Sequence, residues 1–502
     1  MDGVGAQGDK MRNMTPVAKN ENAGAQDPSI TASVPLCVDL DGTLLNTDTL
    51  LEAILQLLRR SLLHGLQLCA WLLRGRAALK SEVARRIDLD ASRLPVNEEL
   101  LGWLRAQRDL GRKLVLCTAA PQSFARAVAD HFELFDEVLA SDDRHNLSGR
   151  KKGQRLAVLY GEGQFDYAGN ALRDLQVWKH ARAAIVVTPT LPLVLRLRRV
   201  PRVERVFRRN GGRGRPLLRT LRVHQWAKNV LVFVPALAAQ VLWHPQVLLQ
   251  SVLAFAAFCL AASGTYIVND LLDLDSDRRH PSKRTRPLAS GRLQITEGIA
   301  AAAALIGTSL VIGYLLLGGL FLAAQCAYIF VTLWYSVDLK RRAGADILCL
   351  AGLYTLRILA GSAATHIPPS FWLLAFSMFL FLSLAAAKRS TELAGLESRN
   401  QDQAPGRGYV VSDLPVLLAF GVAAAYCSVL VLALYLFSRA EVQYAHPQVL
   451  WLLCPVFLYW VSRVWLKTHR RQLHEDPVVF ALTDWPSRIV AVAFVTIAWL
   501  AT

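Results

Sequence analysis

Apolar residues follow different patterns in the two halves of the chain. Between residues 31 and 190, short apolar runs end abruptly at polar residues and alternate with amphipathic segments, which is typical of a soluble α/β domain. From about residue 229 onward, apolar segments of bilayer-spanning length follow one another. The pattern therefore predicts an N-terminal α/β domain followed by an all-α polytopic membrane domain.

The membrane domain is expected to contain about nine transmembrane helices. They are predicted at 229–243, 247–268, 296–315, 317–336, 346–364, 370–387, 413–437, 448–466 and 487–502. The loops after the second, fourth, sixth and eighth of these segments carry most of the lysines and arginines. The positive-inside rule places those loops, together with the N-terminal domain, in the cytoplasm.

The chain is strongly basic, because its 502 residues carry a formal net charge of +17. The cytoplasmic loops account for the excess charge, so no nucleic-acid partner is expected. Residues 191–226 form a predicted linker, in which arginines alternate with leucines and valines from Arg196 to Arg222, as in segments that lie on an anionic membrane surface. Residues 1–30 are expected to be disordered and, without an apolar core, not to be a cleavable signal peptide. The eight cysteines lack metal-binding spacing and are interpreted as inert small hydrophobes.

The first candidate chemistry follows the apolar strand that begins at Val34. This strand runs into Asp39, Asp41 and Gly42, two carboxylates one residue apart followed by a residue that allows a sharp turn. Such a pair can divide the work of phosphoryl transfer, since one carboxylate attacks phosphorus and the other protonates the leaving group. A second apolar strand ends at Thr118, whose hydroxyl is suited to a phosphate oxygen.

Lys152 and then Asn170 with Asp174 follow along the chain, and the four pieces in this order resemble the haloacid dehalogenase superfamily of phosphatases. The resemblance covers about residues 34–190 of a predicted domain that spans 31–190. It implies a Rossmann-like sheet, with residues 50–98 as an inserted helical cap. It implies these roles: nucleophile Asp39, acid/base Asp41, phosphate anchors Thr118 and Lys152, and Mg²⁺ ligands Asp39, Asn170 and Asp174.

This sequence departs from the phosphatase pattern at Asn170, where the superfamily usually has an aspartate. An amide oxygen still suits Mg²⁺, and either Asp174 or Asp166 is expected to supply the charge. Lys151 is an alternative to the adjacent Lys152. The competing interpretation is a degenerate regulatory domain without activity.

The second candidate chemistry lies at the end of the predicted membrane helix 247–268. On a continuous helix, Asn269, Asp270, Asp273 and Asp277 share one face, whereas Asp275 points to the other side. Carboxylates at a membrane boundary are costly and usually functional, and oxygen ligands in this number suit Mg²⁺ bound together with substrate phosphates. The alternative is a solvated acidic helix end balanced by the arginines that follow.

Cations follow this acidic face in the loop that contains Lys283, Arg284 and Arg286, as expected of a site that grips a diphosphate from both sides. Farther along, Tyr335 and Lys340 precede a second polar segment that spans 338–346. Arg357 lies at membrane depth, where it either binds substrate or pairs with a polar group of another helix.

The chain from about residue 217 to 502, which includes the predicted membrane domain 227–502, resembles the UbiA superfamily of intramembrane prenyltransferases. Within this superfamily it resembles the polyprenyl-phosphate phosphoribosyltransferase branch. The motifs that carry the closer resemblance begin at Arg222, Asp277, Tyr335, Leu356 and Lys388. The resemblance implies Mg²⁺-dependent transfer of 5-phosphoribose from phosphoribosyl diphosphate to a polyprenyl phosphate, in a bacterial inner membrane.

The roles that follow in the membrane domain fall into three groups. Asp273, Asp277 and Tyr335 are expected to be catalytic, Asn269, Asp270, Asp273 and Asp277 to bind the metal, and Lys228, Asn229, Lys283, Arg284, Arg286, Lys340 and Arg357 to bind substrate. The donor is not decided by these residues, because a polyprenyl diphosphate presents the same Mg²⁺-diphosphate. The alternatives are an aromatic prenyltransferase with an accessory phosphatase and a non-enzymatic polyprenyl-phosphate binding protein.

Overall fold

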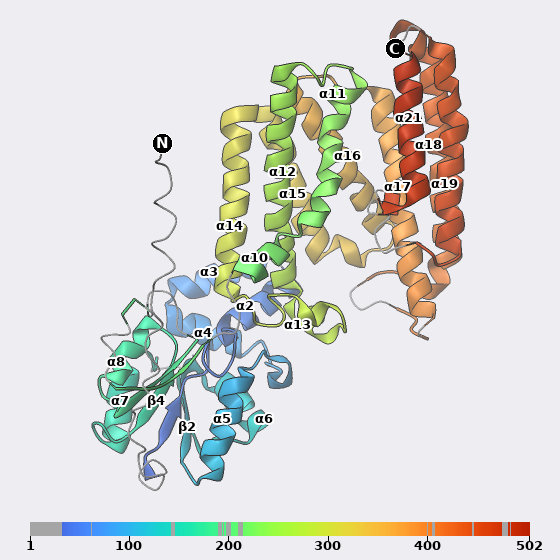
Figure 1. Ribbon diagram of the computed structural model, residues 1–502. Coiled ribbons are helices and arrows are strands. Elements are labelled where there is room, and N and C mark those ends of the chain that lie inside the picture. Colours follow the sequence, from blue (N-terminus) through green and yellow to red (C-terminus); the bar gives the residue numbers. More distant parts are fainter. Residues whose placement is uncertain are drawn as a thin grey trace, which may run out of the picture. The chain divides into compact units, whose positions relative to one another are not determined.

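The chain forms two compact units, and a segment inserted in the sequence of the first unit belongs to the second (Figure 1). The computed structural model describes residues 33–61, 63–141, 146–188, 193, 195–196, 202–208, 214–398, 400–403, 407–443, 446–473, 480–481 and 483–501. One unit, here called the sheet unit, comprises Met1–Leu44 and Val96–Arg208, and the other, the helical unit, comprises Leu45–Pro95 and Arg209–Thr502. The inserted segment Leu45–Pro95 thus belongs to the helical unit, although it separates two strands of the sheet.

The sheet unit is built on a parallel sheet in the order β3-β2-β1-β4-β5-β6. Its strands are β1 (Leu36–Val38), β2 (Leu114–Pro121), β3 (Glu137–Ser141), β4 (Asp166–Gly169), β5 (Ala183–Val187) and β6 (Val203–Phe207). Its helices are α5 (Glu98–Asp109), α6 (Gln122–Phe132), α7 (Arg150–Tyr160) and α8 (Leu175–Trp178). β1, β2, β4 and β5 are almost wholly buried, as in a parallel sheet with both faces covered. The predicted α/β class is confirmed.

The sixth strand changes the interpretation of the predicted linker. β6 pairs in parallel with β5, with Val187 opposite Phe207, so this part of residues 191–226 belongs to the sheet. The linker prediction is wrong there, because alternating arginines and valines also suit an exposed edge strand with one covered end. Residues 191–192, 194, 197–201 and 209–213 of the predicted linker lie outside the described residues, as do residues 1–30, which were expected to be disordered.

The inserted segment contributes α2 (Thr49–Arg60), α3 (His64–Leu73) and α4 (Arg76–Ala84). Asp48 begins α2 by accepting a hydrogen bond from the backbone N–H of Leu51 at 3.0 Å, which satisfies a free N–H of the first turn. Leu51 and Leu55, one turn apart on α2, pack against an apolar cluster of the helical unit that includes Leu271. This apolar face explains why the segment expected to be a cap of the phosphatase is compact with the helical unit.

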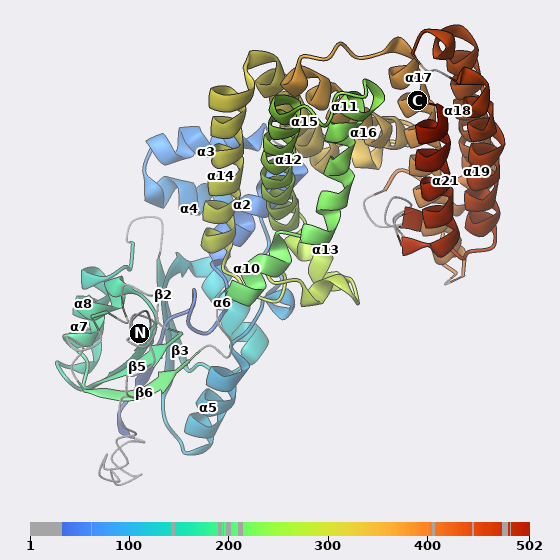
Figure 2. The same ribbon diagram turned by 45° about the horizontal axis from the view of Figure 1, so that its top comes forward.

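Among the described residues, seven helical segments are long and apolar enough to cross a membrane. They are Pro245–Leu272, Ile295–Leu317, Gly319–Val337, Ala345–Thr365, Phe371–Glu397, Val411–Ser438 and Pro447–His469. The corresponding helices are α12 (Pro245–Leu272), α14 (Ile295–Ile312), α15 (Gly319–Val337), α16 (Ala345–Thr365), α17 (Phe371–Glu397), α18 (Leu414–Gln443) and α19 (Leu453–His469). Figure 2 shows them side by side in the helical unit.

The predicted number of nine spans is not confirmed. Residues 229–243 hold the end of a 3₁₀ segment, η4 (Val223–Phe233), and the short helix α11 (Val234–Ala238), because Pro235 and the residues after it interrupt a long helix. Of the predicted span 487–502, residues 487–501 lie in α21 (Trp485–Ala501), which is apolar but shorter than the seven spans. Short α10 (Gly214–Thr220) and α13 (Leu274–Arg279) complete the part that surrounds the candidate site.

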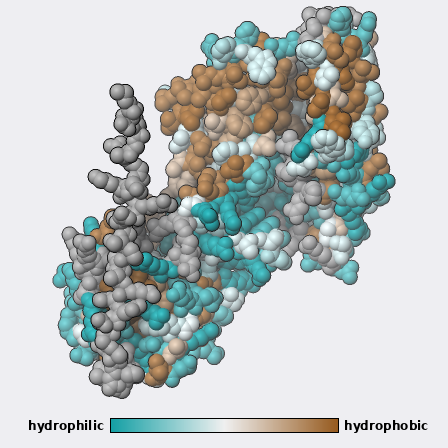
Figure 3. All heavy atoms as spheres, viewed as in Figure 1, coloured by the Kyte–Doolittle hydropathy of each residue, from teal (hydrophilic) through white to brown (hydrophobic). Residues whose placement is uncertain are grey.

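The surface of the helical unit divides by polarity, as expected of a multi-pass membrane protein. In Figure 3 hydrophobic side chains cover the region of α14 and α18, and hydrophilic ones gather at the end that carries α13. Exposed apolar residues such as Leu315 and Phe420 contribute to the hydrophobic region. The polar motifs therefore lie beyond the apolar band.

We expect the buried ion pairs of Asp166 to stabilise the sheet unit. Its carboxylate is 0% exposed and is held by Arg112 and Arg182, so Asp166→Ala leaves the buried guanidinium of Arg112 without a carboxylate and costs about 3–5 kcal/mol. Lys113→Ala is the matched control, since its pair with Glu137 is exposed and contributes at most about 1 kcal/mol. The measurement is the urea concentration at which trypsin begins to cleave the sheet unit of the full chain. Equal midpoints for the two variants would contradict the expectation.

Candidate active sites

The first site lies where the strand order of the sheet unit reverses. β1 lies between β2 and β4, so the strand order reverses here, and in open parallel sheets ligands bind at the carboxyl ends of the strands at such a point. Asp39 follows β1, Thr118 lies in the second half of β2, and Asn170 follows β4. The strand order thus brings together three predicted residues that are far apart in the sequence.

A chain of hydrogen bonds connects the two buried carboxylates of this site. The Nζ atom of Lys152 donates to Asp39 Oδ1 at 2.8 Å and to the hydroxyl of Tyr167 at 2.8 Å. That hydroxyl in turn donates to Asp174 Oδ1 at 3.2 Å. Burial lowers the pKa of Lys152, but the charges of Asp39 and Asp174 and the hydrogen bond to Asp39 together outweigh it, and the pKa is raised. The ammonium therefore remains charged, as a phosphate anchor requires.

Asp174 is fixed by the backbone beside it. Its Oδ2 accepts hydrogen bonds from the N–H groups of Asn170 at 2.9 Å and Ala171 at 2.8 Å. Burial, followed by the nearby charge of Asp39, raises the pKa of Asp174 to about 6. A buried carboxylate beside a second carboxylate is a suitable environment for a divalent cation, which would relieve their repulsion.

The two alternatives considered for this site do not enter it. Asp166 lies at the opposite end of β4 and is held by Arg112 and Arg182. It therefore cannot supply a negative charge to a metal bound beside Asp39. Lys151 is exposed, whereas Lys152 is buried beside Asp39. Asp41 is partly buried in the turn after Asp39.

Gly42 allows Asn170 to approach this turn. Its φ angle is +74°, and a Cβ atom there would lie 2.1 Å from Asn170 Nδ2. Only glycine combines this backbone conformation with so close a neighbour. The turn after Asp39 and the amide of Asn170 are therefore fitted to each other.

The second site begins at the end of α12. The sequence predicted one continuous helix through the acidic motif, but α12 ends at Leu272 and α13 begins at Leu274, with Asp273 between them at φ −95° and ψ 8°. The shared helix face is thus replaced by a break. Asn269 and Asp270 lie on the last turn of α12, and Asp277 lies on α13.

Asp270 and Asp277 remain neighbours across this break because one arginine bridges them. Arg286 Nη1 lies 3.1 Å from Asp270 Oδ1 and 2.6 Å from Asp277 Oδ2. Arg222 also pairs with Asp270. Burial raises the pKa of Asp277, Arg286 opposes the shift and the charge of Asp270 adds to it. Asp275 points elsewhere, as predicted, and pairs with Arg279 and Arg93.

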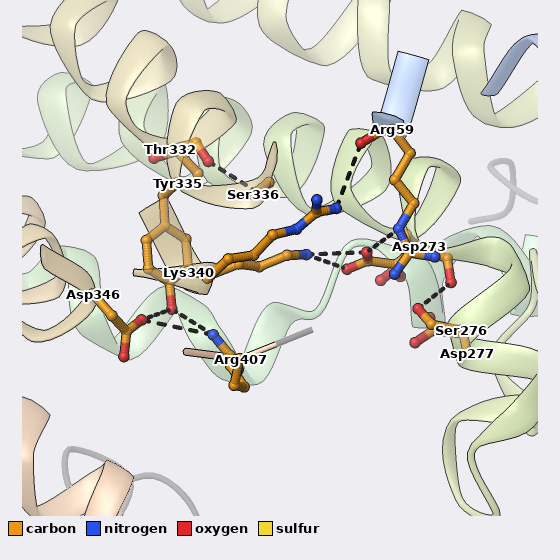
Figure 4. A network of polar contacts seen from close by, with 12 residues as sticks. Arg59, Asp273, Ser276, Asp277, Thr332, Tyr335, Ser336, Lys340, Asp346 and Arg407 are labelled. Carbon is orange, nitrogen blue, oxygen red and sulfur yellow. Dashed lines mark hydrogen bonds and ion pairs between the residues drawn. The ribbon is translucent and has the colours of Figure 1, made fainter. Parts of the chain in front are cut away.

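Asp273 faces a different set of cations, shown in Figure 4. Lys340 Nζ donates to both of its oxygens, at 3.0 and 2.9 Å, and Arg59 Nε of α2 lies 3.8 Å from Oδ1. Burial lowers the pKa of Lys340, Asp273 opposes this shift, and Arg407 and Arg59 add to it. The loop between α15 and α16 is thereby tied to the acidic motif.

Tyr335 belongs to a neighbouring cluster around Asp346. Its hydroxyl donates to Asp346 Oδ1 at 2.7 Å and accepts a hydrogen bond from Arg407 at 3.0 Å (Figure 4). It also accepts a hydrogen bond from Arg389 at 2.7 Å. Asp346 is 0% exposed and also pairs with Arg389, which reaches Glu392. The second polar segment therefore centres on Asp346.

The remaining predicted substrate-binding residues lie apart from the carboxylates. Lys283 and Arg284, in the 3₁₀ turn η5 (Lys283–Thr285), are exposed. Arg357 is buried and donates to Asn229 Oδ1 at 2.9 Å and to the hydroxyl of Tyr328 at 3.2 Å. These bonds favour the structural alternative for Arg357 and Asn229. Lys228, the neighbour of Asn229 in η4, is buried as well.

Two cations of the second site were missed by the sequence reasoning. Arg59 belongs to a segment expected to cap the phosphatase, and Arg407 lies in a loop without a recognisable motif. Neither has a local signal. The apolar spacing of Leu51 and Leu55 on the helix of Arg59 indicated only that one face of this helix is buried.

The donor atoms of both sites suit Mg²⁺, although the carboxylates of the second are paired with protein cations. Within the described residues, no three histidine, cysteine, aspartate or glutamate side chains cluster closely enough to form a metal site by themselves. Asp270, Asp273 and Asp277 nevertheless provide hard oxygen ligands at one helix break, and Asp39, Asn170 and Asp174 provide them at one sheet edge. In both places a metal would take over part of the neutralisation that lysine or arginine now provides.

Comparison with protein families confirms both resemblances. The model described as UbiA prenyltransferase family matches residues 230–486, and the model described as haloacid dehalogenase-like hydrolase matches residues 36–164. Both matches indicate enzymatic activity, a transferase and a hydrolase. The first match contains the break at Asp273, and the second contains Asp39, Thr118 and Lys152.

Similar proteins fall into three groups. An uncharacterised protein of Sinorhizobium fredii, y4nM, is 36% identical over 471 residues, which cover 92% of this chain and 90% of its own. The nodulation protein NoeC of Azorhizobium caulinodans is 37% identical over 271 residues, covering 53% of this chain and 87% of its own. The decaprenyl-phosphate phosphoribosyltransferase of Mycolicibacterium smegmatis is 38% identical over 181 residues, covering 35% of this chain and only 57% of its own.

Among solved structures, a UbiA homolog from Archaeoglobus fulgidus bound to GPP and Mg²⁺ aligns with 57% of this chain and 99% of its own. The TM-score is 0.45 and the sequence identity 17%.

We expect Gly42→Ala to lower the hydrolysis of p-nitrophenyl phosphate by the full chain roughly tenfold or more. The new methyl group displaces Asn170, and small displacements in a catalytic site are costly. Gly111→Ala is the control, since Gly111 has φ +79° with nothing within 4 Å and therefore bears the backbone strain alone. Initial rates at saturating Mg²⁺ provide the measurement. Equal rates for the two variants would show that the contact with Asn170 is not needed.

Proposed function

Because the chain belongs to the UbiA prenyltransferase family and carries a haloacid dehalogenase-like hydrolase domain, we propose a two-step function. The helical unit transfers 5-phosphoribose from phosphoribosyl diphosphate to a polyprenyl phosphate. The sheet unit then removes the 5-phosphate from the lipid-linked ribose. The membrane is the bacterial inner membrane, and the sheet unit and the basic loops lie on its cytoplasmic side.

The observation that carries the transfer is the alternation of carboxylates and cations at the break between α12 and α13. Asp270, Asp273 and Asp277 would hold Mg²⁺, which supplies charge neutralisation for a diphosphate leaving group. Arg286 and Lys340 lie against these carboxylates and would be free to bind the phosphates if a metal took their place. A site that only bound a neutral lipid would need neither set.

The transfer exchanges one bond at the anomeric carbon of ribose. The bond from this carbon to the diphosphate oxygen breaks, and its electron pair leaves with diphosphate. An oxygen of the lipid phosphate forms the new bond to the same carbon. Positive charge that develops on the sugar is stabilised by the nearby carboxylates of the motif, and the partly buried Arg286 and Lys340 balance the departing negative charge.

The choice of donor and acceptor is supported by relatives named decaprenyl-phosphate phosphoribosyltransferase, which match part of the chain. A lipid phosphate needs a cation near the membrane boundary, and Lys228 in η4 is the candidate. Arg357 is left out of this role because Asn229 and Tyr328 already occupy its donors. An aromatic acceptor would instead need a compact apolar pocket with a base.

The phosphatase step follows from the chemistry of the first product, which keeps its 5-phosphate. Asp39 attacks phosphorus, Asp41 protonates the ribose oxygen that leaves, and water then releases phosphate from the aspartyl-phosphate. Lys152 and Thr118 would hold the phosphate oxygens, and Asp39, Asn170 and Asp174 would hold Mg²⁺. The raised pKa of Lys152 supports its role as a permanent cation.

Removal of one motif carboxylate should abolish transfer. Asp277→Ala takes away a metal ligand and leaves Arg286 with one carboxylate fewer, so the labelled product should fall by at least about a hundredfold. Asp275→Ala on the same short helix is the control, because Asp275 points to Arg279 and Arg93, and it should retain most of the activity. Membranes containing each variant are incubated with labelled phosphoribosyl diphosphate, polyprenyl phosphate and Mg²⁺, and the extracted lipid is counted. Full transfer by Asp277→Ala would remove Asp277 from the site, and labelling by a prenyl diphosphate alone would favour the aromatic prenyltransferase.

Silencing the phosphatase should change the product and not the transfer. In Asp39→Asn the nucleophile is absent, so polyprenyl-phosphoryl-5-phosphoribose should accumulate while the total lipid-linked ribose stays the same. Asp109→Asn, at the exposed end of α5, is the control. Mass spectrometry of both lipids gives the ratio. An unchanged ratio in Asp39→Asn would show that the sheet unit acts on another substrate.

A further inference from the structure

The inserted segment packs directly on the loop that carries the acidic motif. Leu51 and Leu55 of α2 lie against the apolar cluster that contains Leu271 and Leu288, which flank the motif on both sides. Both ends of the insertion also meet this loop, since a Cβ atom on Gly291 would lie 2.8 Å from the side chains of Asn46 and Pro95. These three contacts hold α2 against the motif within the helical unit.

Ion pairs between the insertion and the motif hold this arrangement. Arg278 donates to both carboxylate oxygens of Glu52, at 3.2 and 2.5 Å, and this glutamate side chain is only 1% exposed. Thr47 donates to the same carboxylate at 2.6 Å. Arg93 Nη1 lies 3.3 Å from Asp275 Oδ1. A buried bidentate pair of this kind fixes orientation as well as position.

Arg59 on the last turn of α2 points from this anchored helix to Asp273. Its Nε lies 3.8 Å from Asp273 Oδ1, and its side chain is 25% exposed (Figure 4). This separation is an ion-pair distance but is longer than a hydrogen bond, so the guanidinium is attracted to the carboxylate without being locked to it. Lys340 already binds both oxygens of Asp273. One carboxylate thus faces two cations.

We propose that Arg59 is a donor-binding residue of the transferase, contributed by the segment inserted between strands of the sheet unit, and that it binds the diphosphate group of the donor. The inference rests on the proposed function only in placing a diphosphate at the acidic motif. A guanidinium presents a planar fork of N–H donors that matches two phosphate oxygens. Arg59 and Lys340 carry two positive charges, whereas Asp273 carries one negative charge. The excess positive charge attracts a further anion, and the diphosphate of the donor is that anion.

The consequence is that the transferase is not confined to the C-terminal half of the chain. Its acidic motif, its cationic loops and η7 (Leu339–Arg341) come from that half, whereas Arg59 comes from residues that precede β2. The helix that presents it is held by Glu52 and Leu51. Arg60, in contrast, is exposed and donates to the carbonyl of Arg86 at 3.2 Å. Adjacent arginines on one helix therefore have different surroundings.

The test compares Arg59→Ala and Arg59→Lys with Arg60→Ala in the purified full chain. Arg59→Ala should raise the KM for the donor roughly tenfold to a hundredfold, the effect of losing a charge-assisted contact, with the KM for the acceptor unchanged. Arg59→Lys should recover part of the loss, because it restores the charge but not the fork. Arg60→Ala should behave as the unaltered protein. Hydrolysis of p-nitrophenyl phosphate, equal in all variants, serves as the check on folding.

A second measurement reads the site without turnover. Mg²⁺-pyrophosphate is titrated calorimetrically into the Asp39→Asn chain. The dissociation constant should rise tenfold or more when Arg59→Ala is added to this chain, and it should stay unchanged when Arg60→Ala is added. Unchanged pyrophosphate affinity and donor KM in Arg59→Ala would overturn the proposal, as would an equal loss in Arg60→Ala. If the protein instead uses a prenyl diphosphate donor, the function proposed above fails, but the pyrophosphate titration still decides the role of Arg59.

Discussion

The helical unit depends on neutralising three carboxylates at the end of a membrane helix. Charge at this boundary is expensive unless it is paired, and each aspartate draws its partner from another part of the chain. Asp270 and Asp277 share Arg286, and Asp273 pairs with Lys340. The loop after α13 and the loop between α15 and α16 are therefore positioned by the same electrostatic requirement. A bound metal cation would pair with the aspartates, and a diphosphate anion would pair with Arg286 and Lys340. Because the charges of the two bound groups have opposite sign, together they would change the net charge of the site little.

In the sheet unit, one lysine and one tyrosine hydroxyl stabilise two buried carboxylates. Asp39 and Asp174 are both buried, and Lys152 reaches the first directly and the second through Tyr167. The pKa of Asp174 rises to about 6 because burial and the charge of Asp39 disfavour its ionised form. This shared arrangement keeps two metal-type ligands close at some cost in stability. Sites of this kind are typical of function, since packing alone would not require a second carboxylate.

Local patterns predicted what is encoded locally. The residues around Asp39 and the acidic motif at Asp270 were recognisable because a few neighbouring positions carry the chemistry, and apolar length revealed most membrane helices. Contacts across long sequence separations were not predictable: Arg59 gave no local sign of meeting Asp273, and Asp166 looked like a ligand until its arginine partners were known. The helix break at Asp273 was also missed, because a 3.6-residue period assumes that the helix continues. The edge strand β6 was taken for a linker, since exposed edges and surface linkers have the same composition.

The inserted segment leaves and re-enters the sheet unit at one place, since it begins after Leu44 and ends at Pro95. Its two ends are held side by side, because Asn97 N–H donates to the Leu44 carbonyl at 2.9 Å and Asn46 N–H donates to the Pro95 carbonyl at 2.7 Å. The insertion is therefore closed at its base, and its ordering does not depend on the helices between these ends alone. Because Glu52 and Leu51 hold α2 against the helical unit, the same closed segment presents Arg59 to Asp273. A segment closed at its base and packed along one face loses little further freedom when Arg59 binds an anion, so the contact costs little conformational entropy.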